Sequence, residues 1–171
     1  WAKLNNLKQA AKTMNFLTEH GISSYGELES KLTAVSARRD TAHAEIKRIE
    51  SRSAELALVM KHAGTYRQLK PLYERYRKSN DKEKFLRGHE SEIILFEAAA
   101  RELKRLGTVP LPTTESMKTE LANLNAEKER LLAEYKAARA EAQEYDTVKQ
   151  NVDALLTVPK EQEQQRRHEL E

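Results

Sequence analysis

The stretch TYRQLKPLYERYRKSN, residues 65–80, combines the two residue types that bind single-stranded nucleic acids. It holds three tyrosines, whose rings can stack on bases, and five Lys/Arg residues, whose charges can contact phosphates. On a helix, Tyr66, Tyr73 and Tyr76 share one face with Leu69. This spacing predicts that the tyrosines pack inward and that the cations point into water, where they can still reach phosphates.

Positive charge is concentrated around this stretch. Residues 65–88 carry eight Lys/Arg against three Asp/Glu, a local net charge of +5 in a chain whose total is +3. A solvated helix face and a phosphate-binding surface both explain such a cluster, and the sequence leaves the two open. The candidate phosphate contacts are its basic residues: Arg67, Lys70, Arg75, Arg77, Lys78, Lys82, Lys84 and Arg87.

The sequence lacks the residue patterns typical of an enzyme. It contains no glycine-rich phosphate loop and no GxSxG or HExxH motif. The carboxylates alternate with Lys and Arg, as in helices with i,i+4 ion pairs. The histidines are too widely separated for ordinary metal-ligand spacing: His20, His43, His62, His89 and His168. We therefore expect no catalytic, cofactor-binding or metal-binding residues and no enzymatic activity in this chain.

The composition is that of long helices in water. Of the 171 residues, 39% are hydrophobic and 33% are charged, and the mean hydropathy is -0.80. The chain has no cysteine, which excludes disulfides and fits a reducing compartment. It also has no apolar run long enough to span a bilayer and no secretory signal pattern. We expect a cytoplasmic, all-α protein without a membrane partner.

Three glycines, Gly21, Gly64 and Gly107, each follow a helical pattern. Glycine is common just past a helix end because it adopts the left-handed conformation without a Cβ penalty. We therefore expect breaks at all three. The expected helical segments are 4–20, 24–62, 65–80, 81–106 and 113–158.

Helix starts are indicated by capping residues. Ser24 with Glu27 and Thr65 with Gln68 each fit a capping box, and Thr113 before Glu115 fits an N-cap. Pro71 lacks an N–H group and would clash with the carbonyl of a preceding helical turn. Segment 65–80 is therefore expected either to kink at Pro71 or to begin there.

The two long segments carry heptad-like stripes, whose apolar residues recur in steps of three and four. The first stripe consists of Tyr25, Leu28, Leu32, Val35, Arg39, Ala42, Ile46, Ile49, Ser53, Leu56 and Met60. The second consists of Met117, Leu121, Leu124, Lys128, Leu131, Tyr135, Ala138, Ala142, Tyr145, Val148, Val152 and Leu155. A shorter stripe on segment 4–20 consists of Leu4, Leu7, Ala10 or Ala11, Met14 and Leu17.

Neither long stripe can be buried by its own helix. The simplest assembly is a long antiparallel, coiled-coil-like hairpin, with the two middle segments as a shorter helical pair at one end and a short N-terminal helix. Ala42 and Ala44 would then face Ala138 and Ala142, and Arg39 would pair with Glu141. Pairing of the stripes with a second copy of the chain remains an alternative.

The chain ends differ from its helical body. Residues 1–158 are expected to form one helical domain, and residues 159–171 have no apolar pattern and are expected to be disordered. The last two residues, Leu170 and Glu171, are interpreted as a cloning scar. Because the chain begins at Trp1 without Met, we expect a fragment of a longer protein.

Three stretches together resemble one protein family. NLKQAAKTMNFLTEHGISSYGELESK, ERYRKSNDKEKFLRGHESEIILFEAAARELKRLG and EKERLLAEYKAARAEAQEYDTVKQNVDALL resemble, in order and spacing, the C-terminal region of MobA-like relaxases, mobilisation nucleases of conjugative and mobilisable elements in bacteria. The resemblance covers about residues 1–156. In this family, a tyrosine nucleophile and a histidine-held metal nick DNA at the origin of transfer, but those residues belong to an N-terminal nuclease domain whose motifs do not occur here.

The resemblance implies a role in DNA mobilisation without a catalytic step in this chain. The first hypothesis is an accessory domain that binds DNA through residues 65–88, or binds relaxosome or coupling proteins, during conjugative transfer. The second is a purely structural coiled-coil module that dimerises through its stripes or acts as a spacer.

Overall fold

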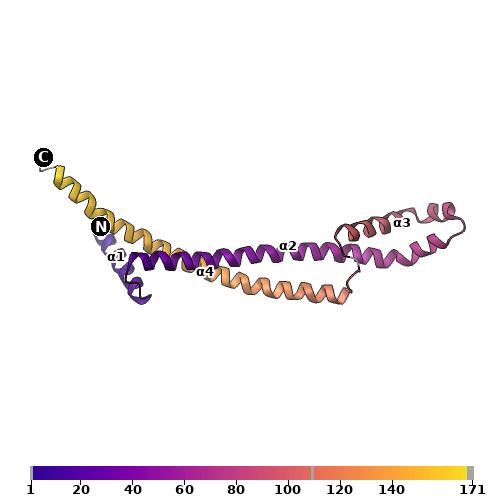
Figure 1. Ribbon diagram of the computed structural model, residues 1–171, viewed down its shortest axis with the longest axis horizontal. Coiled ribbons are helices and arrows are strands. Elements are labelled where there is room, and N and C mark those ends of the chain that lie inside the picture. The colour runs from indigo at the N-terminus through magenta and orange to yellow at the C-terminus, as the bar shows by residue number, and fades with distance from the viewer. Residues whose placement is uncertain (1, 109, 169–171) are drawn as a thin grey trace. The chain divides into compact units, whose positions relative to one another are not determined.

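The computed structural model describes residues 2–108 and 110–168, and the side chains of residues 6–108 and 110–157. These residues form helices α1 (Ala2–Glu19), α2 (Tyr25–Lys78), α3 (Lys82–Arg105) and α4 (Thr114–His168), without a strand among them (Figure 1). The predicted all-α class is therefore confirmed. Within the described chain, no helix has the length and apolar character needed to cross a membrane.

Two of the three predicted glycine breaks are confirmed. Gly21 and Gly107 have φ values of 60° and 68°, the left-handed region in which glycine is favoured. After α1, the N–H of Ile22 donates to the carbonyl of Leu17 over 2.8 Å, and the N–H of Gly21 donates to that of Thr18 over 3.1 Å. These two bonds form a Schellman motif, and the same pair of bonds follows α3 around Gly107.

The predicted break at Gly64 is wrong, because α2 continues through Gly64 and Pro71 to Lys78. Thr65 does not cap a helix start with Gln68. Its hydroxyl donates to the carbonyl of Lys61, one turn earlier in the same helix, over 3.4 Å. Burial explains the continuity: Ala63 is completely buried and Tyr66 packs against the same core cluster. This packing outweighs the cost of about 1 kcal/mol for a glycine inside a helix.

The other two helix starts are capped as predicted. The hydroxyl of Ser24 accepts from the N–H of Glu27 over 3.2 Å, and that of Thr113 accepts from the N–H of Ser116 over 3.0 Å. The carboxylate of Glu27 accepts from the backbone N–H of Ser23 over 2.7 Å. These donations from the backbone N–H and the hydroxyl of Ser23 lower the pKa of Glu27.

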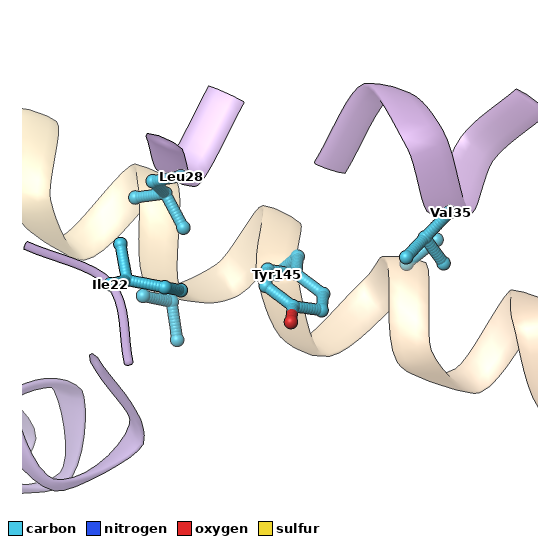
Figure 2. Close-up of a cluster of buried hydrophobic side chains, with 6 residues drawn as sticks. Ile22, Leu28, Val35 and Tyr145 are labelled. Atoms are coloured by element: carbon cyan, nitrogen blue, oxygen red, sulfur yellow. The ribbon is translucent and has the colours of Figure 1, made fainter. Parts of the chain in front are cut away.

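The described chain forms two compact units that share α2 and α4. Unit 1 comprises the described residues of Trp1–Glu45 and Arg130–Glu171, and unit 2 comprises those of Ile46–Glu129. In unit 1, α2 and α4 enclose a core that Figure 2 shows in part. Its buried members are Ile22, Leu28, Val35, Ala142, Tyr145 and Val148.

Three contacts fix an antiparallel register between α2 and α4 in unit 1. The hydroxyl of Tyr25 donates to Asp153 over 2.7 Å, Lys149 lies 3.7 Å from Glu29, and Arg38 pairs with Glu141. Since residue numbers rise on α2 as they fall on α4, the predicted antiparallel pairing is confirmed.

The predicted ion pair between Arg39 and Glu141 is wrong, because Glu141 pairs with the preceding residue of α2. Glu141 pairs with Arg38, whereas Arg39 donates to the neighbouring Asp40 over 2.8 Å. A half-exposed guanidinium at the stripe position can turn to its own helix, while Arg38 beside the stripe reaches across to α4. The alanine prediction needs a similar correction, because Ala42, Ala138 and Ala142 are buried but Ala44 is exposed.

The predicted inner face of α1 is confirmed at Leu17, which packs against the core of unit 1, but it is wrong at Leu7 and Met14. Leu7 and Met14 remain 68% and 60% exposed, whereas Thr13 is almost completely buried. The hydroxyl of Thr13 accepts from the amide of Asn151 on α4 over 3.1 Å. Phe16 packs edge-on against Tyr145 at a centroid distance of 5.1 Å. Polar and aromatic contacts to α4 thus orient α1, and they override its apolar stripe.

Unit 2 contains an antiparallel α2–α4 pair and the α2–α3 pair. Lys128 of α4 lies 2.8 Å from Glu50 of α2, and Glu120 lies 2.7 Å from Arg52. Helix α3 turns back beside the last part of α2, as Figure 1 shows. The core consists of Leu56, Val59, Ala63, Leu103 and Met117. The predicted short helical pair is therefore present, with α2 supplying one member.

Helix α4 runs to His168. The expected division into a helical domain, residues 1–158, and a disordered tail, residues 159–171, stays a prediction. The proposed scar, Leu170 and Glu171, lies outside the described residues.

Candidate nucleic-acid interface

The turn between α2 and α3 positions the basic segment, and its backbone is fixed by short-range hydrogen bonds. Asp81 caps α3, because its carboxylate accepts from the N–H of Lys84 over 3.0 Å. The hydroxyl of Ser79 donates to the carbonyl of Asp81 over 3.0 Å, and the N–H of Ser79 donates to the carbonyl of Tyr76 over 3.2 Å. The end of α2 and the start of α3 are therefore held close together.

Next to this turn, aromatic side chains of α2 pack against aromatic side chains of α3. Phe96 of α3 stacks on Tyr66 at 4.9 Å and on Tyr73 at 4.2 Å between ring centroids. Tyr76 lies 6.1 Å from Phe85. All three tyrosines are half-buried, so the prediction that they pack inward is confirmed. Rings held in this way are not free to stack on bases.

The hydroxyl of Tyr73 has a partner on α3 as well. It donates to the carboxylate of Glu97 over 3.2 Å. Burial, followed by the charge of Glu97, raises the pKa of Tyr73. Tyr73 is therefore a neutral packing residue with its polar end satisfied.

Arg67 stands apart from the other seven predicted phosphate contacts. Its guanidinium donates to Oγ1 of Thr114 over 2.6 Å and to the carbonyl oxygen of Pro112. The side chain is half-buried and ties α2 to the segment that leads into α4. The structure therefore gives Arg67 a structural role.

Two further cations interact with neighbouring side chains. The guanidinium of Arg75 lies over the ring of Phe85, 5.9 Å from its centroid. Arg87 pairs with Glu83 at 3.3 Å, and both side chains are more than 70% exposed. A surface pair of this kind is weak, so Arg87 can exchange its carboxylate for a phosphate.

The remaining five cations are exposed and form no ion pair among the described residues: Lys70, Arg77, Lys78, Lys82 and Lys84. The last four flank the α2–α3 turn within eight residues, and we call them the basic tip. Arg77 and Lys78 lie at the C-terminus of α2, where the helix dipole favours cations. Lys82 and Lys84 lie in the first turn of α3, where it disfavours them.

We also searched the described part of the chain for a metal site and for a groove that could bind a ligand. No cluster of three or more His, Cys, Asp or Glu residues there could hold a metal ion. A groove of about 780 Å³ lies between α1 and α4 in unit 1. Among its polar lining residues, the amide of Asn151 accepts from Gln9 and donates to the hydroxyl of Thr13.

Comparison with known proteins does not name a family. No family model, no curated protein and no solved structure matches this chain.

Proposed function

We propose that this chain is a non-catalytic helical module that binds the phosphate backbone of DNA through its basic tip, within a protein that mobilises DNA. The observation that carries the proposal is the position of Arg77, Lys78, Lys82 and Lys84. Four exposed cations without carboxylate partners in the described structure surround one hydrogen-bonded turn. Such positioned cations are what phosphate contacts require.

The helix dipoles explain two of the four cations of the basic tip, those at the end of α2. Arg77 and Lys78 offset the negative end of the α2 dipole. Lys82 and Lys84 add positive charge to the positive end of α3, where Asp81 and Glu83 already supply the negative charge that the helix dipole favours. Stabilisation of α3 therefore does not explain these two lysines, which are exposed at the turn.

The packing of the tyrosines determines the expected type of recognition. Because Tyr66, Tyr73 and Tyr76 are engaged between α2 and α3, the tip offers charges without free stacking rings. We therefore expect binding that depends little on base sequence and occurs with both single- and double-stranded DNA.

The mobilisation part of the proposal rests on the resemblance to the C-terminal region of MobA-like relaxases. In that setting the chain acts in the cytoplasm and holds DNA near a nuclease domain that is not part of this sequence. Contacts with relaxosome or coupling proteins are a further role that the resemblance suggests.

A salt series with fluorescent DNA tests the proposal. Anisotropy titrations of the chain with labelled single-stranded and duplex DNA should give affinities that fall linearly on a log–log plot against salt. Four phosphate contacts correspond to a slope of about -3.6 for duplex DNA. Absence of binding at low salt would refute the proposal.

A purely structural module is the second candidate, supported by the two heptad stripes. The stripes are largely buried between α2 and α4 within the chain, including Leu28, Ala42, Ile49, Met117 and Ala138. They are thus already covered, and a dimerising module would need another surface.

A further inference from the structure

Helix α3 exposes an apolar patch outside its core face. Its buried side chains are Ile93, Phe96, Ala99 and Leu103. Ile94 and Leu95 are 57% and 55% exposed, and Ala98, one turn later, is exposed too. Exposed neighbouring apolar residues of this size often mark an interaction site.

Two charges flank this patch. Glu90 and Arg101 are exposed and have no ion pair among the described residues. Among the other charged residues of α3, Arg87 pairs with Glu83 and Arg105 with Glu102, and the carboxylate of Glu97 accepts from the hydroxyl of Tyr73. Glu90 and Arg101 are eleven residues apart, or about three helical turns, so they lie on the same side of α3 about 16 Å from each other.

The helix between these charges is regular. The non-helical backbone of α3 is confined to His89, whose φ and ψ are -140° and 26°. Glu90 is the first residue after this kink, so the whole patch from Glu90 to Arg101 lies on one straight stretch. The spacing and direction of the side chains in this patch therefore follow the regular helical repeat of about 1.5 Å and 100° per residue.

We propose that this face of α3 binds the same face of a second copy of the chain, in antiparallel orientation about a twofold axis near Ile94. A twofold interface must be self-complementary. An axis midway between Glu90 and Arg101 places each Glu90 opposite the Arg101 of the other copy. The Ile94 side chains of the two copies then meet near the centre, with Ala98 beside them and Leu95 at the edge of the contact.

The charge order selects this partner. One acidic and one basic residue on opposite sides of an apolar centre satisfy an antiparallel copy twice, with both charges paired each time. A single pair of helices is smaller than the interfaces of stable dimers, so we expect weak self-association. The proposal is independent of DNA binding, because it uses none of the four residues of the basic tip.

Sedimentation velocity across a concentration series, without DNA, tests this inference. The wild-type chain should show concentration-dependent dimerisation. Glu90→Arg and Arg101→Glu each turn two attractive contacts into repulsive ones, so each variant should dimerise about tenfold more weakly. Leu95→Gln should also weaken dimerisation. Lys136→Glu, a charge reversal on an exposed residue of α4, is the matched control and should behave as wild type.

The decisive sample is an equimolar mixture of the Glu90→Arg and Arg101→Glu chains. In a mixed dimer both contacts are again between opposite charges, so association should return to the wild-type strength. Circular dichroism on each variant verifies that the helices are intact. A chain that stays monomeric at all concentrations, or a mixture that associates no better than its components, would overturn the proposal.

Discussion

The guanidinium of Arg67 on α2 donates to the hydroxyl of Thr114, the first residue of α4, over 2.6 Å. It also donates to the carbonyl oxygen of Pro112, which precedes that helix. Arg67 therefore joins α2 to the start of α4 inside unit 2. A residue that the sequence groups with the candidate phosphate-contacting cations serves the fold instead.

Replacing Arg67 with Ala should lower stability without affecting DNA binding. The loss of charged hydrogen bonds at a half-exposed site should reduce the free energy of unfolding by about 1–2 kcal/mol. Arg77→Ala, an exposed residue of the basic tip, is the matched control and should change stability by no more than about 0.5 kcal/mol. Urea unfolding and DNA titration of both variants would check this, and weaker DNA binding by the folded Arg67→Ala chain would contradict it.

Two glycine substitutions should have opposite effects. A Cβ added at Gly64 would meet no atom within 4 Å, and Gly64 lies inside α2. Gly64→Ala should therefore raise the free energy of unfolding by about 1 kcal/mol. Gly107 also has open space but a φ of 68°, so Gly107→Ala should lower it by about 1–2 kcal/mol. If thermal unfolding showed Gly64→Ala to be destabilising, α2 would not be continuous there.

A larger side chain at Ala138 should disturb unit 1. Ala138 is completely buried on α4, whereas its neighbour Ala137 is exposed. Ala138→Leu should lower the free energy of unfolding by about 1–3 kcal/mol through overpacking, while Ala137→Leu should leave it nearly unchanged. Equal effects in a denaturant titration would mean that the two alanines do not differ in burial.

Acid should weaken the contact between Tyr25 and Asp153. The hydroxyl of Tyr25, followed by Lys149, lowers the pKa of Asp153 below its ordinary value of 3.8. A lowered pKa means that the ionised carboxylate stabilises the fold above pH 3.8 and loses this effect as the pH falls through the pKa of the folded state. The stability difference between wild type and Tyr25→Phe should therefore shrink in urea titrations below pH 3.8. A difference that stays constant down to pH 2 would contradict this assignment.

The sequence predicts the parts of the fold that depend on local or periodic signals. Heptad spacing identifies the residues buried between α2 and α4, and Gly21 and Gly107 end their helices as expected. Gly64 gives the same local signal, but it lies in a helix whose neighbours Ala63 and Tyr66 are held by tertiary packing. Local propensity alone cannot reveal that packing.

Side-chain partners are less predictable than burial. The stripe on α1 predicts that Leu7 and Met14 are buried, yet a hydrogen bond between Thr13 and Asn151 turns the helix otherwise. At the candidate site, spacing correctly predicts that the tyrosines face inward. It does not predict that Arg67 reaches Thr114, because that contact joins residues 47 positions apart.

The most direct test of the proposed function compares two variants of equal net charge. One replaces the basic tip: Arg77→Gln, Lys78→Gln, Lys82→Gln and Lys84→Gln. The control removes four exposed cations elsewhere that form no ion pair in the described structure: Lys61→Gln, Lys118→Gln, Lys136→Gln and Arg139→Gln. Both are titrated with labelled DNA over a salt series.

If the basic tip holds the phosphates, its variant should lose most of the affinity and its salt dependence should become shallower by about 0.9 per lost contact. The control should keep both the affinity and the slope of the wild type, apart from a small uniform decrease. Equal losses in the two variants would show that overall charge alone attracts DNA, and they would contradict the assignment of the site to the α2–α3 turn.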